Sequence, residues 1–233
     1  MLLKHKLLSI PDSCQKIWRY IDLTKYLDLL ITGELHFSNP NQFDDPYDTS
    51  ISAYFRENNL PTFILKTFHD IFMRGNIHIN CWHLNEEESA ALWKIYMKSD
   101  EGIAIQSSIG RLIQVIEKAD RGIYLGKVNY ENVTDIVRKI ESSLSIVTSA
   151  QIEMITNKRK SFQHEQEVRI FVLESEKLGL STTERVKIDI NTLIENVYVN
   201  PKAPSWVYET IKSVSKKYGL KANVIHSKLY SIR

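Results

Sequence analysis

Glycine, proline and cysteine are scarce in this chain. Its 233 residues include eight Gly, six Pro and two Cys. So few Gly and Pro exclude low-complexity linkers and leave few places for a Gly-rich phosphate-binding loop. The cysteines, Cys14 and Cys81, are far apart in a chain without a secretory leader, so we expect reduced thiols and a cytoplasmic location.

Long apolar runs are also absent. Lys4, His5 and Lys6 interrupt the apolar residues near the start, and no later stretch approaches the roughly 18 apolar residues of a membrane span. With 43% apolar and 25% charged residues, the composition is typical of a soluble globular protein. No composition shift or internal repeat divides the chain, so we expect one domain over residues 1–233 and no membrane partner.

Several well-known motifs are missing. The chain has no Cys-x-x-Cys pair, P-loop, Gly-x-Gly-x-x-Gly or Gly-x-Ser-x-Gly. Their absence argues against a structural zinc site, a P-loop NTPase, a Rossmann domain and an α/β-hydrolase. His164 and Glu165 resemble the start of a zinc-protease helix, but Val168 stands where the second histidine ligand is required. We therefore expect no bound metal.

The net charge of +2 is unevenly distributed. Residues 196–233 carry a net charge of +6, which leaves −4 for the rest of the chain. This basic end could attract a polyanion such as nucleic acid, or it could be the solvated face of a helix. Its charged residues are Lys202, Lys212, Lys216, Lys217, Lys221, Lys228 and Arg233, with Glu209 as the one acid.

Apolar patterning predicts a mixture of strands and helices without regular βαβα alternation. This favours an α+β fold with mixed, mainly antiparallel sheets and flanking helices. The predicted strands are 17–21, 35–38, 77–82, 102–106, 123–130, 168–173, 186–190, 197–199 and 222–226. The predicted helices are 23–32, ended by Gly33; 86–99, with a capping box at Asn85 and Glu88; 133–158; and a C-terminal helix from Pro204 to Gly219.

An acidic turn follows the second predicted strand. Asp44, Asp45 and Asp48 lie within five residues, beside Pro46. Asp44 and Asp45 could bind a cation or orient a substrate hydroxyl. They could equally form a loop in which Asx side chains bond nearby backbone amides.

Aromatic and hydroxyl side chains recur near the third strand. Ser89, Trp93 and Tyr96 are spaced by four and three residues, so they share one helix face. Such a stripe could stack on and hydrogen-bond a flat heterocycle, or it could pack in the core. His83, at the end of the preceding strand, is in a place where binding sites often lie.

Two further strands end in polar groups. Ser107 and Ser108 close an apolar strand and could bind a ligand or cap the following helix. Glu165, Glu167 and Arg169 alternate and would project to one face of an extended chain. The two carboxylates could stabilise a cationic transition state or accept a proton from a nucleophile, or they could form ion pairs at a sheet edge.

These segments together resemble a widespread bacterial family of unknown function. The resemblance lies in Gly-x-Leu-x-Phe-Ser-x-Pro at 33–40, Phe-Asp-Asp-Pro at 43–46, Trp-x-x-Tyr at 93–96, Gly-Ile-Ala-Ile at 102–105 and His-Glu-x-Glu-x-Arg at 164–169. The family has no settled activity, so this resemblance implies no function.

A more distant similarity is to ADP-ribosyltransferases, which bind NAD in a mixed α+β domain. By this resemblance Arg19 would hold the phosphate or ribose of NAD, and Ser107 would support the nicotinamide ribose. Glu167, with Glu165 two residues before it, would stabilise the oxocarbenium-like ribose and orient the acceptor. Trp93, Tyr96, His83 and Ser89 would complete the NAD site, and Asp44, Asp45 and Arg169 would contact substrate or support the site.

Three functional hypotheses result. The leading one is an NAD-dependent ADP-ribosyltransferase-like enzyme, a toxin or phage-defence effector with a nucleic-acid or protein acceptor. The second is a noncatalytic module that binds nucleic acid or protein through its basic C-terminal helix. The third is a metal-dependent nuclease built on Asp44, Asp45 and Glu167.

Overall fold

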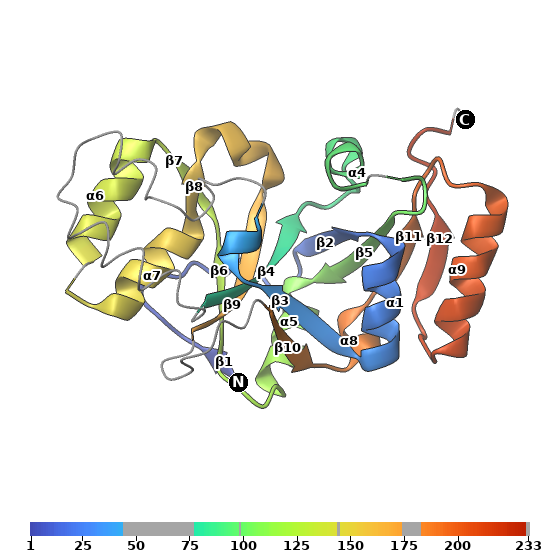
Figure 1. Cartoon of the computed structure of the whole chain (residues 1–233), viewed down its shortest axis with the longest axis horizontal. Coiled ribbons are helices and arrows are strands. Elements are labelled where there is room, and N and C mark those ends of the chain that lie inside the picture. Colours follow the sequence, from blue (N-terminus) through green and yellow to red (C-terminus); the bar gives the residue numbers. More distant parts are fainter. Residues whose placement is uncertain (44–76, 98, 144, 174–182, 232–233) are drawn as a thin grey trace.

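A long mixed β-sheet runs through the protein, with helices on both faces (Figure 1). The structure is a computed structural model, and it describes residues 1–43, 77–97, 99–143, 145–173 and 183–231. Its secondary structure confirms the predicted α+β class. The prediction of a single domain stays a prediction.

Ten strands form the main sheet of the described chain. Their order is β1-β6-β9-β4-β2-β5-β11-β12, and β3 and β10 form a branch beside β4. Pairing is parallel between β1 and β6 and between β11 and β12, and antiparallel elsewhere. The bounds are Leu2–Leu3 (β1), Lys16–Ile21 (β2), Glu34–Ser38 (β3), Ile77–Leu84 (β4), Ile103–Ser108 (β5), Ile123–Lys127 (β6), Glu167–Leu173 (β9), Thr183–Lys187 (β10), Asn196–Val199 (β11) and Asn223–His226 (β12).

The sheet forks beside β4. The end of β4 pairs with β2, where His83 lies opposite Trp18, whereas its first half pairs with β3 at Ile79. Strands β2 and β3 therefore lie along the same edge of β4. Arg19 of β2 and Asn80 of β4 both donate to the carbonyl of His36 in β3, at 3.4 and 2.9 Å, and so bridge the fork.

Helices pack on both faces of this sheet. Figure 1 shows α6 and α7 at one end of the molecule and α9 at the other. A small parallel sheet of β7 and β8 accompanies α6 and α7. The bounds are Leu23–Thr32 (α1), Ala90–Tyr96 (α4), Ile109–Glu117 (α5), Val133–Ser143 (α6), Val147–Thr156 (α7), Ile190–Leu193 (α8), Ser205–Lys217 (α9), Asn129–Glu131 (β7) and Asn157–Arg159 (β8), with 3₁₀ turns at Pro40–Gln42 (η1) and Lys160–Glu165 (η2).

The strands bury apolar side chains on both faces. On β4, Trp82 joins the largest apolar cluster, which helices α1, α5, α8 and α9 cover. Ile79, on the opposite face, joins a second cluster with side chains of α6 and α7. A third cluster packs Trp18 and Tyr20 of β2 under α4. This burial of alternate residues on two faces explains why the strands read as nearly continuous apolar runs.

Local signals fix several helix ends, of which those at Gly33 and Pro204 were predicted. Asp22 accepts the Lys25 N–H at the start of α1, and Gly33 ends that helix in the left-handed region, with φ of 63°, which glycine adopts without a Cβ clash. Helix α9 begins directly after Pro204, as its sequence indicated. Neither Cys14 nor Cys81 forms a disulfide.

Four elements have boundaries other than those predicted. The expected helix 133–158 is divided into α6 and α7, because Ser142 and its neighbours are short polar residues that compete for backbone bonds; the Ser142 hydroxyl donates to the Lys139 carbonyl. The expected strand 123–130 is two strands, since the Val128 N–H turns to the Glu167 carbonyl. The strand expected over 186–190 lies earlier, at Thr183–Lys187 (β10), because Asp189 already caps α8.

The helix expected over 86–99 is also shorter than predicted. Ser89 is its N-cap and accepts the Leu92 N–H, so α4 begins at Ala90. Asn85 and Glu88 therefore do not form a capping box. The Glu88 carboxylate instead accepts from Trp93 Nε1 at 2.9 Å and from Ser227 Oγ at 2.6 Å, which fixes α4 to the segment after β12.

None of the helices in the described part of the chain combines the length and apolar composition needed to span a bilayer.

Candidate active site

A buried lysine joins the two glutamates singled out in the sequence. Lys158 Nζ donates to Glu165 Oε2 at 2.6 Å and to Glu167 Oε1 at 2.8 Å. Lys158 and Glu167 are each 5% exposed, and Glu165 is 8% exposed. Buried charges are costly unless they are paired and hydrogen-bonded, so this cluster is a feature that needs a function or a strong packing reason.

Three elements bring these groups together. Lys158 lies on β8, Glu165 ends η2 and Glu167 begins β9. Gln166 between the glutamates adopts a left-handed conformation, with φ of 43°, which costs a non-glycine residue free energy. The prediction that both glutamates lie on one extended strand was therefore wrong. Their carboxylates converge because the chain bends at Gln166.

Arg169 holds Glu167 from the other side. Arg169 Nε donates to Glu167 Oε2 at 2.6 Å, and its Nη1 donates to the Ile155 carbonyl at 2.9 Å. The guanidinium is fully buried, so it fixes the position of Glu167 and does not present a free charge to solvent. Both oxygens of Glu167 thus contact cations.

The two carboxyl groups differ in pKa. Burial, together with the hydrogen bond and negative charge of Glu167, raises the pKa of Glu165 well above the usual range. Burial alone would also raise the pKa of Glu167, but the charge of Arg169, the hydrogen bond with Glu165 and the charge of Lys158 outweigh it and hold that pKa far below the usual range. Such a divergence within a carboxyl pair is typical of acid–base sites.

His83 lies opposite Glu167 in the β4–β9 register. Its Nδ1–H donates to the Glu165 carbonyl, and burial lowers the pKa of the imidazole. Burial thus favours the neutral ring, in which Nδ1 carries the proton and Nε2 the lone pair. This buried Nε2 has no partner among the described residues. An unsatisfied buried acceptor costs about 1–3 kcal/mol, which a ligand donor would recover.

Two tyrosines border the glutamates. The Tyr130 hydroxyl accepts the Glu167 backbone N–H at 2.8 Å. Tyr96, at the end of α4, keeps 46% of its surface exposed. Burial of its hydroxyl and the charges of Glu165 and Glu167 raise the pKa of Tyr96, so the hydroxyl lies within electrostatic reach of the carboxyl pair.

The other members of the predicted aromatic face have packing roles. Trp93 is 3% exposed and meets the Tyr20 ring edge-on, with centroids 5.1 Å apart. Tyr20 in turn lies 6.4 Å from the His83 ring, and its hydroxyl accepts the Ser89 N–H at 2.7 Å. Of the stripe Ser89, Trp93 and Tyr96, only Tyr96 stands beside the glutamates.

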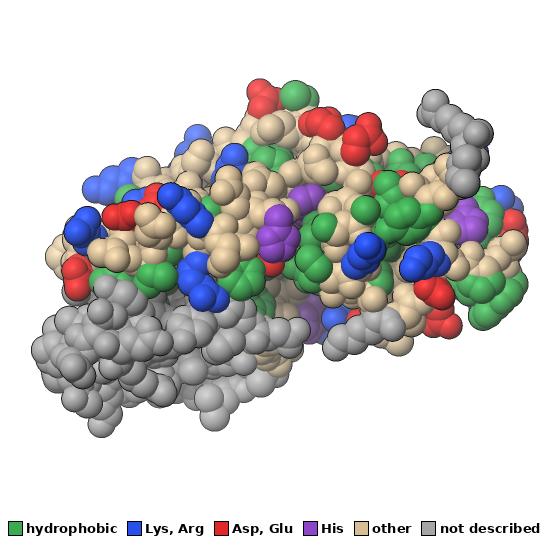
Figure 2. All heavy atoms as spheres, turned by 90° about the horizontal axis from the view of Figure 1, so that it is seen from above, with side chains coloured by type: hydrophobic (Ala, Val, Ile, Leu, Met, Phe, Trp, Pro, Cys, Tyr) green, Lys and Arg blue, Asp and Glu red, His purple; other side chains and the backbone are tan. Residues whose placement is uncertain are grey.

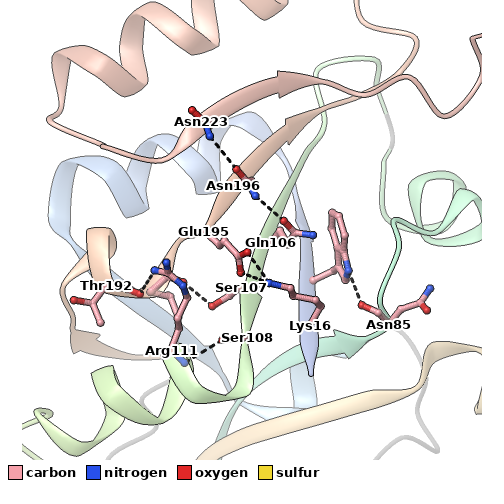
Figure 3. A network of polar contacts seen from close by, with 12 residues as sticks. Lys16, Asn85, Gln106, Ser107, Ser108, Arg111, Thr192, Glu195, Asn196 and Asn223 are labelled. Carbon is pink, nitrogen blue, oxygen red and sulfur yellow. Dashed lines mark hydrogen bonds and ion pairs between the residues drawn. The ribbon is translucent and has the colours of Figure 1, made fainter. Parts of the chain in front are cut away.

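Ser107 lies away from this cluster. It is fully buried, and its Oγ donates to the Leu193 carbonyl at 2.5 Å. Figure 3 shows it within a polar network that ties β5 to α8 and β11 and includes the Lys16–Glu195 ion pair. Ser108 caps α5, which was one of the two roles predicted for these serines.

Arg19 occupies the fork of the sheet. Burial lowers its pKa to about 10, against an opposing effect of Cys81. Its hydrogen bond to the His36 carbonyl places it on the β3 side of β4, and none of the contacts of the described chain joins it to Glu165 or Glu167. The structure thus brings together Glu165, Glu167, Arg169, His83 and Tyr96, and leaves Arg19 and Ser107 apart.

No metal centre is found in the part of the chain that the structure describes: no three metal-ligating side chains lie together there. Asp44 and Asp45 lie outside the described residues. The Glu167 carboxylate already contacts two cations.

Lys158 and Tyr130 are the site residues that the sequence did not reveal. Lys158 stands in the run Lys158-Arg159-Lys160, which has the appearance of a solvated basic segment. Its burial follows only from the docking of β8 and η2 against β9. The parallel pairing that sets Tyr130 beside Lys158 joins segments 28 residues apart.

A surface pocket of about 580 Å³ opens next to this cluster. It is lined by Tyr130, Glu131, Asn132, Asp135, Arg138, Lys139 and Lys160. Tyr130 therefore belongs both to the pocket wall and to the surroundings of Glu167.

Comparison with known proteins confirms the expected resemblance to an uncharacterised family. The family model described as "Protein of unknown function (DUF2971)" matches residues 92–170, a range that includes the motifs at 93–96, 102–105 and 164–169. A search of curated proteins gives no match. Among solved structures, DarT from Thermus sp. 2.9 in complex with carba-NAD+ matches with a TM-score of 0.44 and 12% sequence identity, over 94% of this chain and 97% of that chain.

Proposed function

We propose that this protein is an NAD-consuming ADP-ribosyltransferase with Glu165 and Glu167 at its catalytic centre. The observation that carries the proposal is the buried carboxyl pair: two glutamates on one lysine, with pKa values driven in opposite directions. The substrate, NAD, is inferred from the Glu-x-Glu pattern at 165–167 and its resemblance to that of ADP-ribosyltransferases.

The reaction needs a negative environment and a base. The bond between the nicotinamide nitrogen and ribose C1′ breaks, nicotinamide leaves with the bonding electron pair, and positive charge develops on the ribose. The acceptor nucleophile then bonds to C1′ and loses a proton. Fixed charges that are aimed at a developing charge, and a base with a pKa near neutrality, are what accelerate such steps.

Each glutamate suits one of these tasks. The lowered pKa of Glu167 keeps it ionised, so it supplies the fixed negative charge, held in place by Arg169 and Lys158. The raised pKa of Glu165 brings it closer to neutrality, and only one of its oxygens contacts Lys158. Glu165 is therefore the proton acceptor for the acceptor nucleophile.

His83 and Tyr96 are assigned to the substrate. The lone pair on His83 Nε2 would accept a hydrogen bond from a ribose hydroxyl, and the exposed Tyr96 ring would pack against the nicotinamide. Arg19 remains a candidate for the phosphates, at the fork of the sheet. In the cell, this chemistry would suit a cytoplasmic toxin or phage-defence effector.

The decisive experiment is release of nicotinamide from NAD by the purified chain. We expect Glu167→Gln to reduce the rate by at least about 100-fold, since a fixed charge at the reacting centre contributes 10²–10³-fold, while the variant stays folded. Glu117→Gln, an exposed glutamate on α5, is the matched control and should keep the wild-type rate. Absence of NAD cleavage by the wild type would sink the proposal.

A second candidate is supported by the surface of α9. Trp206 is 65% exposed, and Lys212 Nζ lies 5.5 Å above the Tyr208 ring, which itself stacks on His226. Exposed aromatics beside lysines suit a nucleic-acid contact. A noncatalytic binding module of this kind predicts salt-dependent binding that Glu167→Gln leaves unchanged.

A further inference from the structure

We infer that the pocket beside Tyr130 binds a phosphate-bearing nucleotide unit of a nucleic-acid acceptor. This rests on the proposed function, for which the pocket would supply the second substrate. The pocket is lined by residues of β7, α6 and η2 and has a volume of about 580 Å³, within the roughly 300–1,000 Å³ of small-molecule sites.

The pocket adjoins the carboxyl pair through a single residue. Tyr130 lines the pocket, and its hydroxyl oxygen accepts the Glu167 N–H. In the β7–β8 pairing, Tyr130 lies opposite Lys158, which contacts both glutamates. One side chain, Tyr130, therefore separates a ligand in the pocket from the backbone of Glu167, and Lys158 opposite it contacts Glu165, the proposed proton acceptor.

The charges of the pocket leave a cationic surplus. Lys139 pairs with Glu131 at 2.5 Å, and Arg138 makes a long exposed contact of 3.5 Å to Asp135. Lys160 is exposed and has no ion-pair or hydrogen-bond partner among the described residues. Figure 2 shows basic side chains gathered at the end of the molecule that carries α6. Lys160 and Arg138 could therefore bind an anion without breaking a strong ion pair.

Two neutral groups favour a nucleotide over a bare anion. The Tyr130 oxygen already accepts from Glu167, and its own proton has no acceptor in the described chain, so it can donate to a ligand oxygen. Asn132 offers both a donor and an acceptor. Arg and Lys bind phosphate oxygens, and tyrosine and asparagine can contact a sugar or base at the same time.

The test is direct binding of a short fluorescent single-stranded oligonucleotide, by anisotropy and without NAD. The pocket variant is Arg138→Gln with Lys160→Gln, because glutamine removes the charge and keeps helix propensity. We expect it to bind at least about tenfold more weakly. The slope of log K against log salt should fall by roughly 1.4, at about 0.7 for each lost phosphate contact to a single strand.

Three comparisons make the outcome specific. Lys4→Gln with Lys118→Gln removes two exposed lysines outside the pocket and should bind as the wild type does. Lys212→Gln with Lys216→Gln tests α9. If this variant binds the oligonucleotide more weakly and the pocket variant binds it as the wild type does, the inference is overturned. A mononucleotide and a phosphopeptide serve as competitors: displacement by the mononucleotide supports the pocket, and displacement by the phosphopeptide alone assigns it to a phosphoprotein.

The result is separable from that of the proposed function. Oligonucleotide binding is read without NAD, and nicotinamide release is read without an oligonucleotide. If the wild type does not bind the oligonucleotide, or the pocket variant binds it equally well, the inference fails whether or not NAD is cleaved. If NAD is not cleaved while the pocket binds, only the enzymatic proposal fails.

Discussion

At the scale of single residues, Lys158 determines the character of the site. One ammonium group serves two carboxyl groups, so one of these groups carries excess negative charge unless it is protonated. Arg169 supplies Glu167 with a second cation and so keeps it ionised, which leaves Glu165 as the group that takes the proton. The opposite pKa shifts of the two glutamates follow from this unequal supply of cations.

The pH profile of NAD cleavage tests this balance. Glu165 must be ionised to accept a proton, so the acidic limb of kcat/KM should lie above the ordinary glutamate range. The charge of Lys158 lowers the pKa of Glu165, so Lys158→Met should move the limb upward by about 1–3 pH units, the usual effect of a close opposite charge. An unmoved limb, in variants shown to be folded by circular dichroism, would exclude Glu165 as the base.

The same shifts have opposite effects on stability. The pKa of Glu165 is raised in the folded state. Its contribution to the free energy of unfolding is therefore fully present at a pH below its pKa in the unfolded chain, and is lost as the pH rises through its pKa in the folded protein. The pKa of Glu167 is lowered in the folded state. Its contribution to the free energy of unfolding is therefore fully present at a pH above its pKa in the unfolded chain, and is lost as the pH falls through its pKa in the folded protein.

At the scale of elements, α4 connects packing and function. Its last residue, Tyr96, feels the charges of the carboxyl pair, whereas the N–H of its cap, Ser89, donates to the Tyr20 hydroxyl. The sequence predicted that Ser89, Trp93 and Tyr96 share one helix face, but Ser89 is the N-cap and lies outside the helix. The sequence did not reveal which of them are buried, because β2 supplies the cover, and β2 lies some seventy residues earlier in the chain.

Substitutions at Ser89 distinguish a cap from a ligand contact. Ser89→Ala should reduce the free energy of unfolding by about 1 kcal/mol, the usual loss for an N-cap side chain. Ser89→Asp keeps a capping oxygen and should restore most of that stability, measured by urea denaturation. The affinity for NAD should be equal in the two variants. If Ser89→Asp binds NAD more weakly, Ser89 contacts the ligand and is more than a helix cap.

At the scale of the whole molecule, the forked sheet separates two kinds of structure. On one side, β2, β5 and β11 form a conventional core under α1, α5 and α9. On the other, β9 carries Glu167 and Arg169, β4 carries His83, and β8 and η2 supply Lys158 and Glu165. Strand β4 belongs to both parts, with Trp82 in the large core and His83 beside the glutamates.

Ligand-linked stability tests the whole molecule. NAD at about 100 times its Kd should stabilise the folded state by roughly 2.7 kcal/mol, which raises Tm by about 5–10 °C for a chain of this size. Glu167→Gln, which should bind NAD without cleaving it, is the protein for this measurement. His83→Ala should show a smaller shift because it lacks the Nε2 acceptor, and an equal shift would remove His83 from the substrate site.

The sequence by itself determined the elements whose signals are local. The Gly33 cap, the apolar strands and the start of α9 after Pro204 depend on neighbours within a few residues, so periodicity and capping rules predict them. The pair Glu165 and Glu167 was also visible as a pattern. The ends of α6 and α7 were not, because short polar residues interrupt a continuous apolar face.

Only the tertiary structure decided what these residues contact. Lys158 is buried because β8 pairs with β7 and lies against β9, and Ser107 is directed to α8 because β5 presents it to the other face of the sheet. These placements depend on contacts between segments far apart in the sequence. The free energy of burying a charge or a hydroxyl is set by the partners that those segments supply, and no local pattern specifies them.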